Sequence, residues 1–159
     1  MKINTAAAGH TGPVKNGVAE WLAYDNKLDK QLKMLQKALE TIKTVKGWKP
    51  CNDCFKKLPG GKSFDDILDD DTVWISYCPD NANYGFTNRV GGNEITVCEL
   101  AFRWGVWTVG GTIVHEMGHV NGAPTDTHAA EGTLLCCGYS KVHDPTIIGT
   151  RDVEFPTYA

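Results

Sequence analysis

Residues 108–121, TVGGTIVHEMGHVN, decide the fold predicted for this chain. Apolar residues occur on two sides of this segment, and Gly122 and Pro124 follow it, which predicts a buried helix that ends at this glycine and proline. His115 and His119 are four residues apart and should lie one turn from each other on the same helix face. The predicted helix therefore presents two imidazoles side by side.

Residues 115–119, HEMGH, match the pattern H-E-x-x-H, in which both histidines bind one tetrahedral zinc ion. Glu116 projects from the adjacent edge of that face, where it does not bind the metal but can accept a proton from water. Bound zinc lowers the pKa of its water to about 7 and polarises a scissile carbonyl. The motif predicts hydrolysis of an amide bond, with zinc as the cofactor and Glu116 as the general base.

The competing interpretation is a pair of surface histidines on an amphipathic helix. The flanking residues are apolar and should bury this helix: Ile113, Val114, Met117 and Val120. Burying two imidazoles without a partner is unfavourable, and a metal ion removes that cost. The flanking sequence therefore favours the metal site.

A catalytic zinc site of this kind needs a third protein ligand and one open position. His128 is the predicted ligand, because a neutral imidazole binds zinc well and the turn at residues 122–125 can bring the chain back over the helix. Asp126 and Glu131 are alternative ligands. Either carboxylate could instead orient a ligating histidine, and Asp126 could form a turn.

Other segments give weaker patterns. Residues 18–46 are predicted to form a long amphipathic backing helix, with lysines on its solvated face and Gly47 at its end. Residues 48–61 are predicted to be a loop, and Ser63 with Asp66 predicts a capping box that opens a short helix. Residues 72–77 and 94–100 are rich in β-formers and predict two strands. The stretch after residue 138 is interrupted by prolines and predicted to be mainly loop.

Six cysteines are many for a cytosolic protein of 159 residues, and they favour three disulfides in an exported domain. The alternative is that Cys51 and Cys54 form half of a structural zinc site or a redox pair. A second C-x-x-C is missing, and the adjacent Cys136 and Cys137 have the wrong spacing for a zinc knuckle. The pairing stays open, although Cys78 and Cys98 lie at the ends of the two predicted strands.

Length and charge set the remaining expectations. A chain of 159 residues suits one domain, and a net charge of -3 calls for neither a nucleic acid nor an anionic membrane as partner. No apolar run approaches the length of a membrane span. Residues 1–17 are small and polar and are predicted to be a flexible leader or linker, followed by a zinc peptidase domain over residues 18–159. The leader has no apolar signal-peptide core, so either the chain is cytosolic as made or a signal or larger parent protein has been removed.

Residues 95–102, ITVCELAF, followed by residues 110–119, GGTIVHEMGH, resemble the deuterolysin and peptidyl-lysine metalloendopeptidase group, the aspzincins. The resemblance covers about residues 72–135 and implies a small zincin with a helical first half, a β-sheet and cysteine bridges. The family's third ligand is an aspartate in a G-T-x-D-x-x-Y segment, and the matching position here is His128. The family's tyrosine, which helps to stabilise the oxyanion, is replaced by Glu131, which leaves Tyr139 as the candidate for that role. In zincins generally, an extended substrate lies along an edge strand, which we place at residues 94–100.

These observations together predict an α+β, zincin-like fold with a long amino-terminal backing helix, a small mostly antiparallel sheet and the H-E-x-x-H helix. The predicted function is that of a monomeric zinc endopeptidase acting on protein or peptide substrates. The cysteines and linker-like start fit a secreted or delivered toxin or effector module. Two alternatives are a zinc amidase acting on cell-wall peptide and a non-catalytic binding domain in which a fourth protein ligand closes the zinc site.

Overall fold

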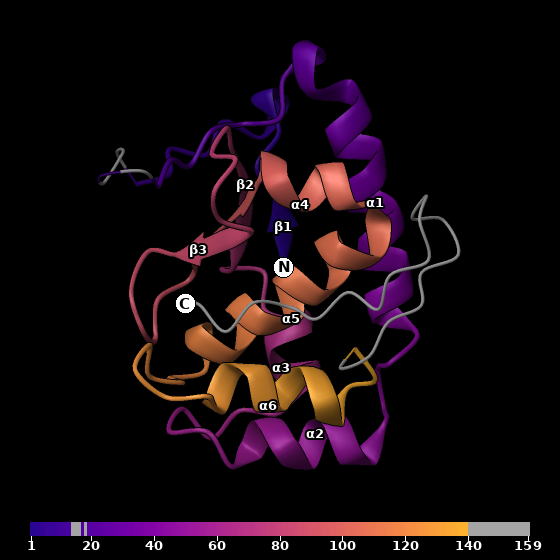
Figure 1. Cartoon of the computed structure of the whole chain (residues 1–159), viewed down its shortest axis with the longest axis vertical. Coiled ribbons are helices and arrows are strands. Elements are labelled where there is room, and N and C mark those ends of the chain that lie inside the picture. Colours follow the sequence, from indigo (N-terminus) through magenta and orange to yellow (C-terminus); the bar gives the residue numbers. More distant parts are fainter. Residues whose placement is uncertain (14–16, 18, 140–159) are drawn as a thin grey trace.

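The computed structural model describes residues 1–13, 17 and 19–139. In this part the chain is α+β, as the sequence predicts, with helices packed against a small mixed sheet (Figure 1). The elements in chain order are β1 (Lys2–Ile3), α1 (Asp29–Lys43), α2 (Lys49–Lys56), α3 (Phe64–Leu68), β2 (Trp74–Cys78), β3 (Gly85–Thr87), β4 (Glu94–Cys98), α4 (Glu99–Trp104), α5 (Val106–Val120) and α6 (Ala129–Cys136). Short 3₁₀ turns occur at Ala6–Ala8 and Asn26–Leu28.

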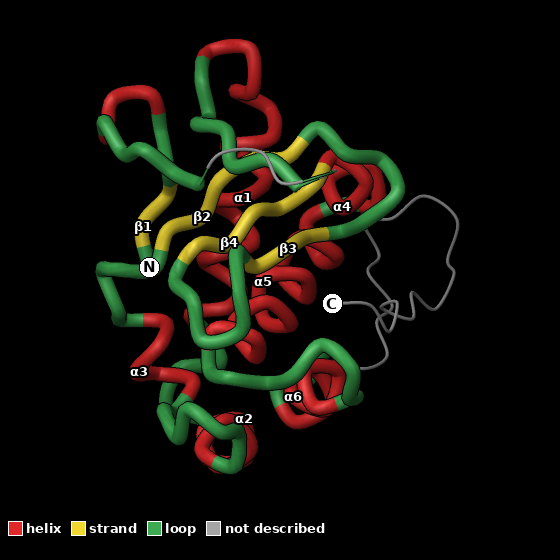
Figure 2. Tube along the Cα trace, turned by 90° about the vertical axis from the view of Figure 1, so that its left-hand side faces the viewer, coloured by secondary structure: helices red, strands yellow, loops and turns green. Residues whose placement is uncertain are grey.

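The strands lie in the order β1-β2-β4-β3 (Figure 2). The prediction of a mostly antiparallel sheet is wrong, because β1 and β4 both pair with β2 in parallel and only β3 runs antiparallel to β4. β3 follows β2 in the chain but pairs with the far side of β4, so β2 and β4 are neighbours without being joined by a hairpin and can run in parallel. The predicted substrate edge at residues 94–100 is also wrong, since β4 is an inner strand whose five residues are all buried. The edge beside it is β3.

The predicted backing helix at residues 18–46 is shorter in the structure, where α1 begins at Asp29. The chain before it is extended: Leu22 exchanges backbone hydrogen bonds with Tyr77, and the Tyr24 N–H donates to the Asn4 carbonyl. Asp25 then caps the 3₁₀ turn by accepting from the Lys27 N–H. These pairings satisfy backbone groups that a longer helix would have used internally.

The described part of residues 1–17 belongs to the folded domain, which differs from the predicted flexible leader. Lys2–Ile3 form β1, and the terminal ammonium donates a 2.7 Å hydrogen bond to the Leu68 carbonyl. Further along, the His10 ring stacks on Trp74 with centroids 4.0 Å apart, and His10 Nε2 lies 2.7 Å from Glu94 Oε1. The segment provides backbone partners for the outer side of β2, which would otherwise be an open edge.

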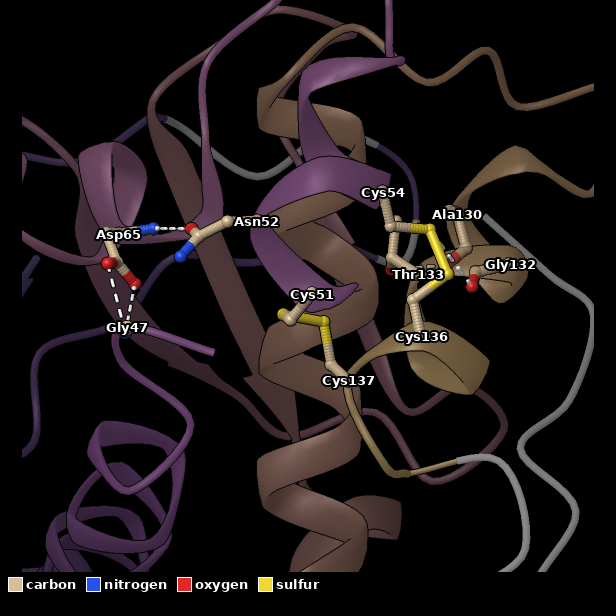
Figure 3. Close-up of a disulfide and its surroundings, with 10 residues drawn as sticks. All are labelled: Gly47, Cys51, Asn52, Cys54, Asp65, Ala130, Gly132, Thr133, Cys136 and Cys137. Atoms are coloured by element: carbon tan, nitrogen blue, oxygen red, sulfur yellow. Dashed lines mark hydrogen bonds between the residues drawn. A yellow bond between two sulfur atoms is a disulfide. The ribbon is translucent and has the colours of Figure 1, made fainter. Parts of the chain in front are cut away.

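The predicted loop at residues 48–61 contains the helix α2. Pro50 lies in its first turn, where the missing N–H leaves no intrahelical bond unmade. Two disulfides, Cys51–Cys137 and Cys54–Cys136, join α2 to the carboxyl end of α6 (Figure 3). The prediction of disulfides is therefore supported for four of the six cysteines.

The other two cysteines, Cys78 and Cys98, are buried and form no disulfide among the described residues, and they lie opposite each other in register on β2 and β4. The hydrogen bond from Cys98 lowers the pKa of Cys78 to about 7, opposed by burial, while the same interaction raises the pKa of Cys98.

In the described residues no helix is both long and apolar enough to cross a membrane.

The helix α5 occupies the centre of the molecule, as predicted for residues 108–121. Every residue from Thr108 to His119 is buried. Its neighbours are β3 and β4 on the sheet side and α1, α4 and α6 on the other sides (Figures 1 and 2). The predicted capping box is present before α3, where Ser63 and Asp66 bond each other's backbone N–H. The H-E-x-x-H residues therefore lie on the buried part of α5.

Candidate active site

The centre of α5 brings His115 and His119 together. Their Nε2 atoms are 3.2 Å apart and their side chains are buried, with 5% and 3% of the residue surface exposed. A tetrahedral ion bound by two imidazoles at about 2.0–2.1 Å holds the two nitrogens about 3.3 Å apart. The observed separation fits that requirement, and without a metal it is also within hydrogen-bond distance between the two rings.

The chain after α5 fixes the orientation of His119. Its Nδ1 donates a 2.7 Å hydrogen bond to the carbonyl oxygen of Ala123. Gly122, with φ of 86°, allows the backbone to turn so that Ala123 lies beside the helix and donates to the Gly118 carbonyl. With its proton on Nδ1, His119 directs the lone pair of Nε2 toward His115, which is the arrangement that a metal ligand requires.

Glu116 is buried next to this pair, on the side of the sheet. Only 2% of its surface is exposed, and its Oε2 accepts a 2.7 Å hydrogen bond from the Thr87 hydroxyl of β3. Burial raises the pKa of Glu116 to about 8, the hydrogen bond from Thr87 opposes this, and the negative charge of Glu131 adds to it. A carboxyl with this pKa can take up and release a proton near neutral pH. Sequence reasoning missed Thr87, because a three-residue strand carries no periodic signal.

Glu131 lies on α6, and its charge acts on Glu116. Its Oε2 is buried and has no hydrogen-bond partner among the described residues. The close packing of α6 on α5 occurs at Gly118, where an added Cβ would lie 3.2 Å from Ala130 Cα. An unpaired carboxylate oxygen in such a position is unfavourable unless a proton or a cation compensates it.

The other predicted site residues lie elsewhere. His128 is exposed at the amino end of α6, and Asp126 is exposed in the preceding loop. Tyr139 is buried against Trp107, with ring centroids 4.8 Å apart, and packs on Gly110 near the start of α5. In the described part of the chain no three His, Cys, Asp or Glu side chains form a ready metal-binding group, so none of the three ligand candidates, His128, Asp126 and Glu131, joins His115 and His119 in this structure.

A cavity of about 260 Å³ opens beside Glu116 and His119. Its wall on the sheet side comes from β3 and the turn that follows it, and the far wall from the loop after α5. The lining residues are Phe86, Thr87, Asn88, Arg89, Val90, Glu116, His119 and Thr125. Tyr139 is not among them. The cavity therefore joins the general-base candidate, one of the paired imidazoles and the edge strand of the sheet.

Searches against protein families, curated proteins and solved structures find no match to this chain. The function is therefore inferred from the side chains of the chain itself.

Proposed function

We propose that this protein is a zinc-dependent endopeptidase of zincin-like fold that hydrolyses internal peptide bonds. The observation that carries the proposal is the pair of buried Nε2 atoms of His115 and His119, 3.2 Å apart, with the His119 tautomer fixed by Ala123. Zinc bound there would polarise the scissile carbonyl and lower the pKa of water at the site. The two disulfides favour an oxidising compartment, so we place the protein outside the producing cell, as a secreted or delivered module.

We propose Glu131 as the third ligand in place of His128. Glu131 has a buried carboxylate oxygen without a described partner, and its charge acts on Glu116, which is adjacent to His115 in the chain. His128 is exposed at the amino end of α6, and it would have to leave solvent to reach the two buried imidazoles. A carboxylate with two histidines is an established donor set for a catalytic zinc.

The remaining roles follow from positions around the cavity. Glu116 accepts the proton of the attacking water and transfers it to the leaving amine, while the Thr87 hydroxyl holds its carboxylate in place. The substrate extends along β3, whose outer edge has no strand partner in the described sheet. No described tyrosine lines the cavity, so the oxyanion-stabilising role is unassigned.

The test is zinc content per chain, together with hydrolysis of casein and of peptidoglycan fragments. Four variants are compared with the wild type: Glu116→Gln, Glu131→Ala, His128→Ala and Asp126→Ala. We expect one zinc per wild-type chain and cleavage of casein. Glu116→Gln should keep the metal and lose activity, whereas only Glu131→Ala among the three ligand candidates should lose both.

Three results would change this conclusion. A wild-type chain that binds no zinc excludes the metallopeptidase. Loss of zinc in His128→Ala, with retention in Glu131→Ala, restores the three-histidine site. Cleavage of peptidoglycan fragments without cleavage of casein identifies a cell-wall amidase.

A further inference from the structure

The cavity beside Glu116 has one strongly basic side chain in its lining. Of the eight residues around it, Arg89 alone is a lysine or arginine. Arg89 follows β3 and is exposed. Its guanidinium can therefore meet a ligand that enters the cavity from solvent.

The turn that carries Arg89 is anchored to the candidate active site. The Gly92 N–H donates a 2.9 Å hydrogen bond to the Arg89 carbonyl, and the Gly91 N–H donates a 2.9 Å bond to the carbonyl of His119. Gly91 has φ of 73°, which a type II turn requires at its third residue. The turn that carries Arg89 is thus bonded, through Gly91, to the backbone of a proposed zinc ligand.

Arg89 has no carboxylate partner among the described residues, in contrast to several surface lysines, which form ion pairs with aspartates. Glu116, the one carboxylate among the lining residues, already accepts a hydrogen bond from Thr87. The positive charge at the cavity is therefore available to a ligand.

We propose that Arg89 makes this cavity a subsite for an acidic side chain, so that the preferred substrates carry Asp or Glu next to the scissile bond. This inference rests on the proposed peptidase function. A guanidinium binds a carboxylate through two parallel hydrogen bonds. The amide of a Gln side chain can accept only part of this pattern, and the ammonium of a Lys side chain is repelled by the guanidinium. Recognition of lysine would need an acidic group in the cavity, and the only carboxylate in the lining, Glu116, is buried and bonded.

The test measures peptide binding to the zinc-loaded Glu116→Gln variant, so that it does not depend on turnover. The probes are fluorescent peptides that differ only by Glu, Gln or Lys at a single position, which is moved along the sequence. At one position we expect Glu to bind about tenfold more tightly than Gln, and Lys to bind more weakly than both. Arg89→Gln should abolish this preference and Arg89→Glu should reverse it.

Arg103→Gln is the matched control, because it removes the same charge from an exposed arginine that lines a different pocket, on α4. That variant should retain the preference for Glu. Equal binding of the three peptides, absence of binding, or a preference that survives Arg89→Gln overturns the acidic subsite. A preference that depends on Arg89 in a wild-type protein that cleaves no peptide supports the subsite and refutes the peptidase.

Discussion

The carboxyl group of Glu116 depends on a hydroxyl that no sequence motif marks. Thr87 donates to it from β3, a strand that itself comes within reach of α5 through Gly85. An added Cβ at Gly85 would lie 2.6 Å from Thr112 Cγ2 and 2.9 Å from the Thr96 carbonyl oxygen. The candidate general base is therefore positioned by a contact between two elements that are separate in the sequence.

Replacement of Thr87 by valine should lower kcat for peptide hydrolysis about 10- to 150-fold, since a hydrogen bond to a charged group contributes about 1.5–3 kcal/mol. KM should change less than twofold, because the hydroxyl bonds Glu116 and not the substrate. Thr87→Ser keeps the donor and should restore most of the rate. Steady-state kinetics on one peptide check this. A change confined to KM would place Thr87 in substrate binding instead.

Gly118, between the two histidines of the motif, allows α6 to approach α5. An alanine there would place its Cβ 3.2 Å from Ala130 Cα and 3.3 Å from Ala130 Cβ. We expect Gly118→Ala to lower the free energy of unfolding by about 1–2 kcal/mol, although alanine favours a helix more than glycine does. Gly132→Ala is the matched control in α6, where nothing lies within 4 Å, and it should raise stability by about 0.5–1 kcal/mol. Urea unfolding measures both, and equal effects would contradict the close packing.

The residues of the site differ in how far the sequence could predict them. The spacing of His115 and His119 placed both on one helix face, and the structure brings them together as expected. Residue spacing could not decide whether His128 or Glu131 is the third ligand. They lie three residues apart, and the direction of α6, set by packing and disulfides, decides which of them points inward.

At the scale of elements, the two disulfides that join α2 to α6 act as one clamp. Their sequence separations are 86 and 82 residues, so each closes almost the same loop. Once one bridge is present, the second removes little further conformational freedom from the unfolded chain. Either bridge should therefore be sufficient to hold α2 and α6 together.

We predict that removing either bridge alone, as Cys51→Ala with Cys137→Ala or as Cys54→Ala with Cys136→Ala, costs much less than removing both. Loss of both should lower the free energy of unfolding by about 4–5 kcal/mol. Zinc affinity should fall only in the variant that lacks all four cysteines, because α6 carries the proposed ligand Glu131 and only this variant has no bridge that holds α6 to α2. Urea unfolding and zinc titration of the three variants check this, and additive losses would contradict it.

The elements that the sequence did not predict have identifiable causes. In α2 the loop signals of Pro50 and the closing glycines concealed a helical pattern, in which Cys51 and Phe55 share a buried face. Before α1, the apolar spacing of Trp21 and Leu22 continued the helical period, but long-range pairing with β2 determined the backbone. Strand pairing of this kind is non-local, and a single sequence does not encode the partner in any short window.

For the whole molecule, the amino-terminal segment contributes a pH-dependent contact. Burial raises the pKa of Glu94, and the adjacent His10 opposes that rise. Because the folded state then binds a proton more readily than the unfolded state, this group makes stability fall as pH increases from about 4.5 through the raised folded-state pKa.

Glu94→Gln should remove that contribution. We expect the difference in the free energy of unfolding, variant minus wild type, to increase as pH rises through this window. Urea unfolding at several pH values from 4 to 8 provides the measurement. Subtracting the two proteins cancels titrating groups that do not interact with Glu94, including Glu116. A difference that stays constant with pH would show that Glu94 ionises equally in both states.

The covalent clamp also determines how the molecule carries mechanical load. Tension applied to the two ends passes from Cys51 to Cys137 through sulfur, so the intervening chain is bypassed. A separation of 86 residues corresponds to about 290 Å of extended chain that stays slack. The histidine-bearing helix lies within that shielded length. An oxidised chain pulled from either terminus can therefore lose its outer segments while the candidate metal site bears no force.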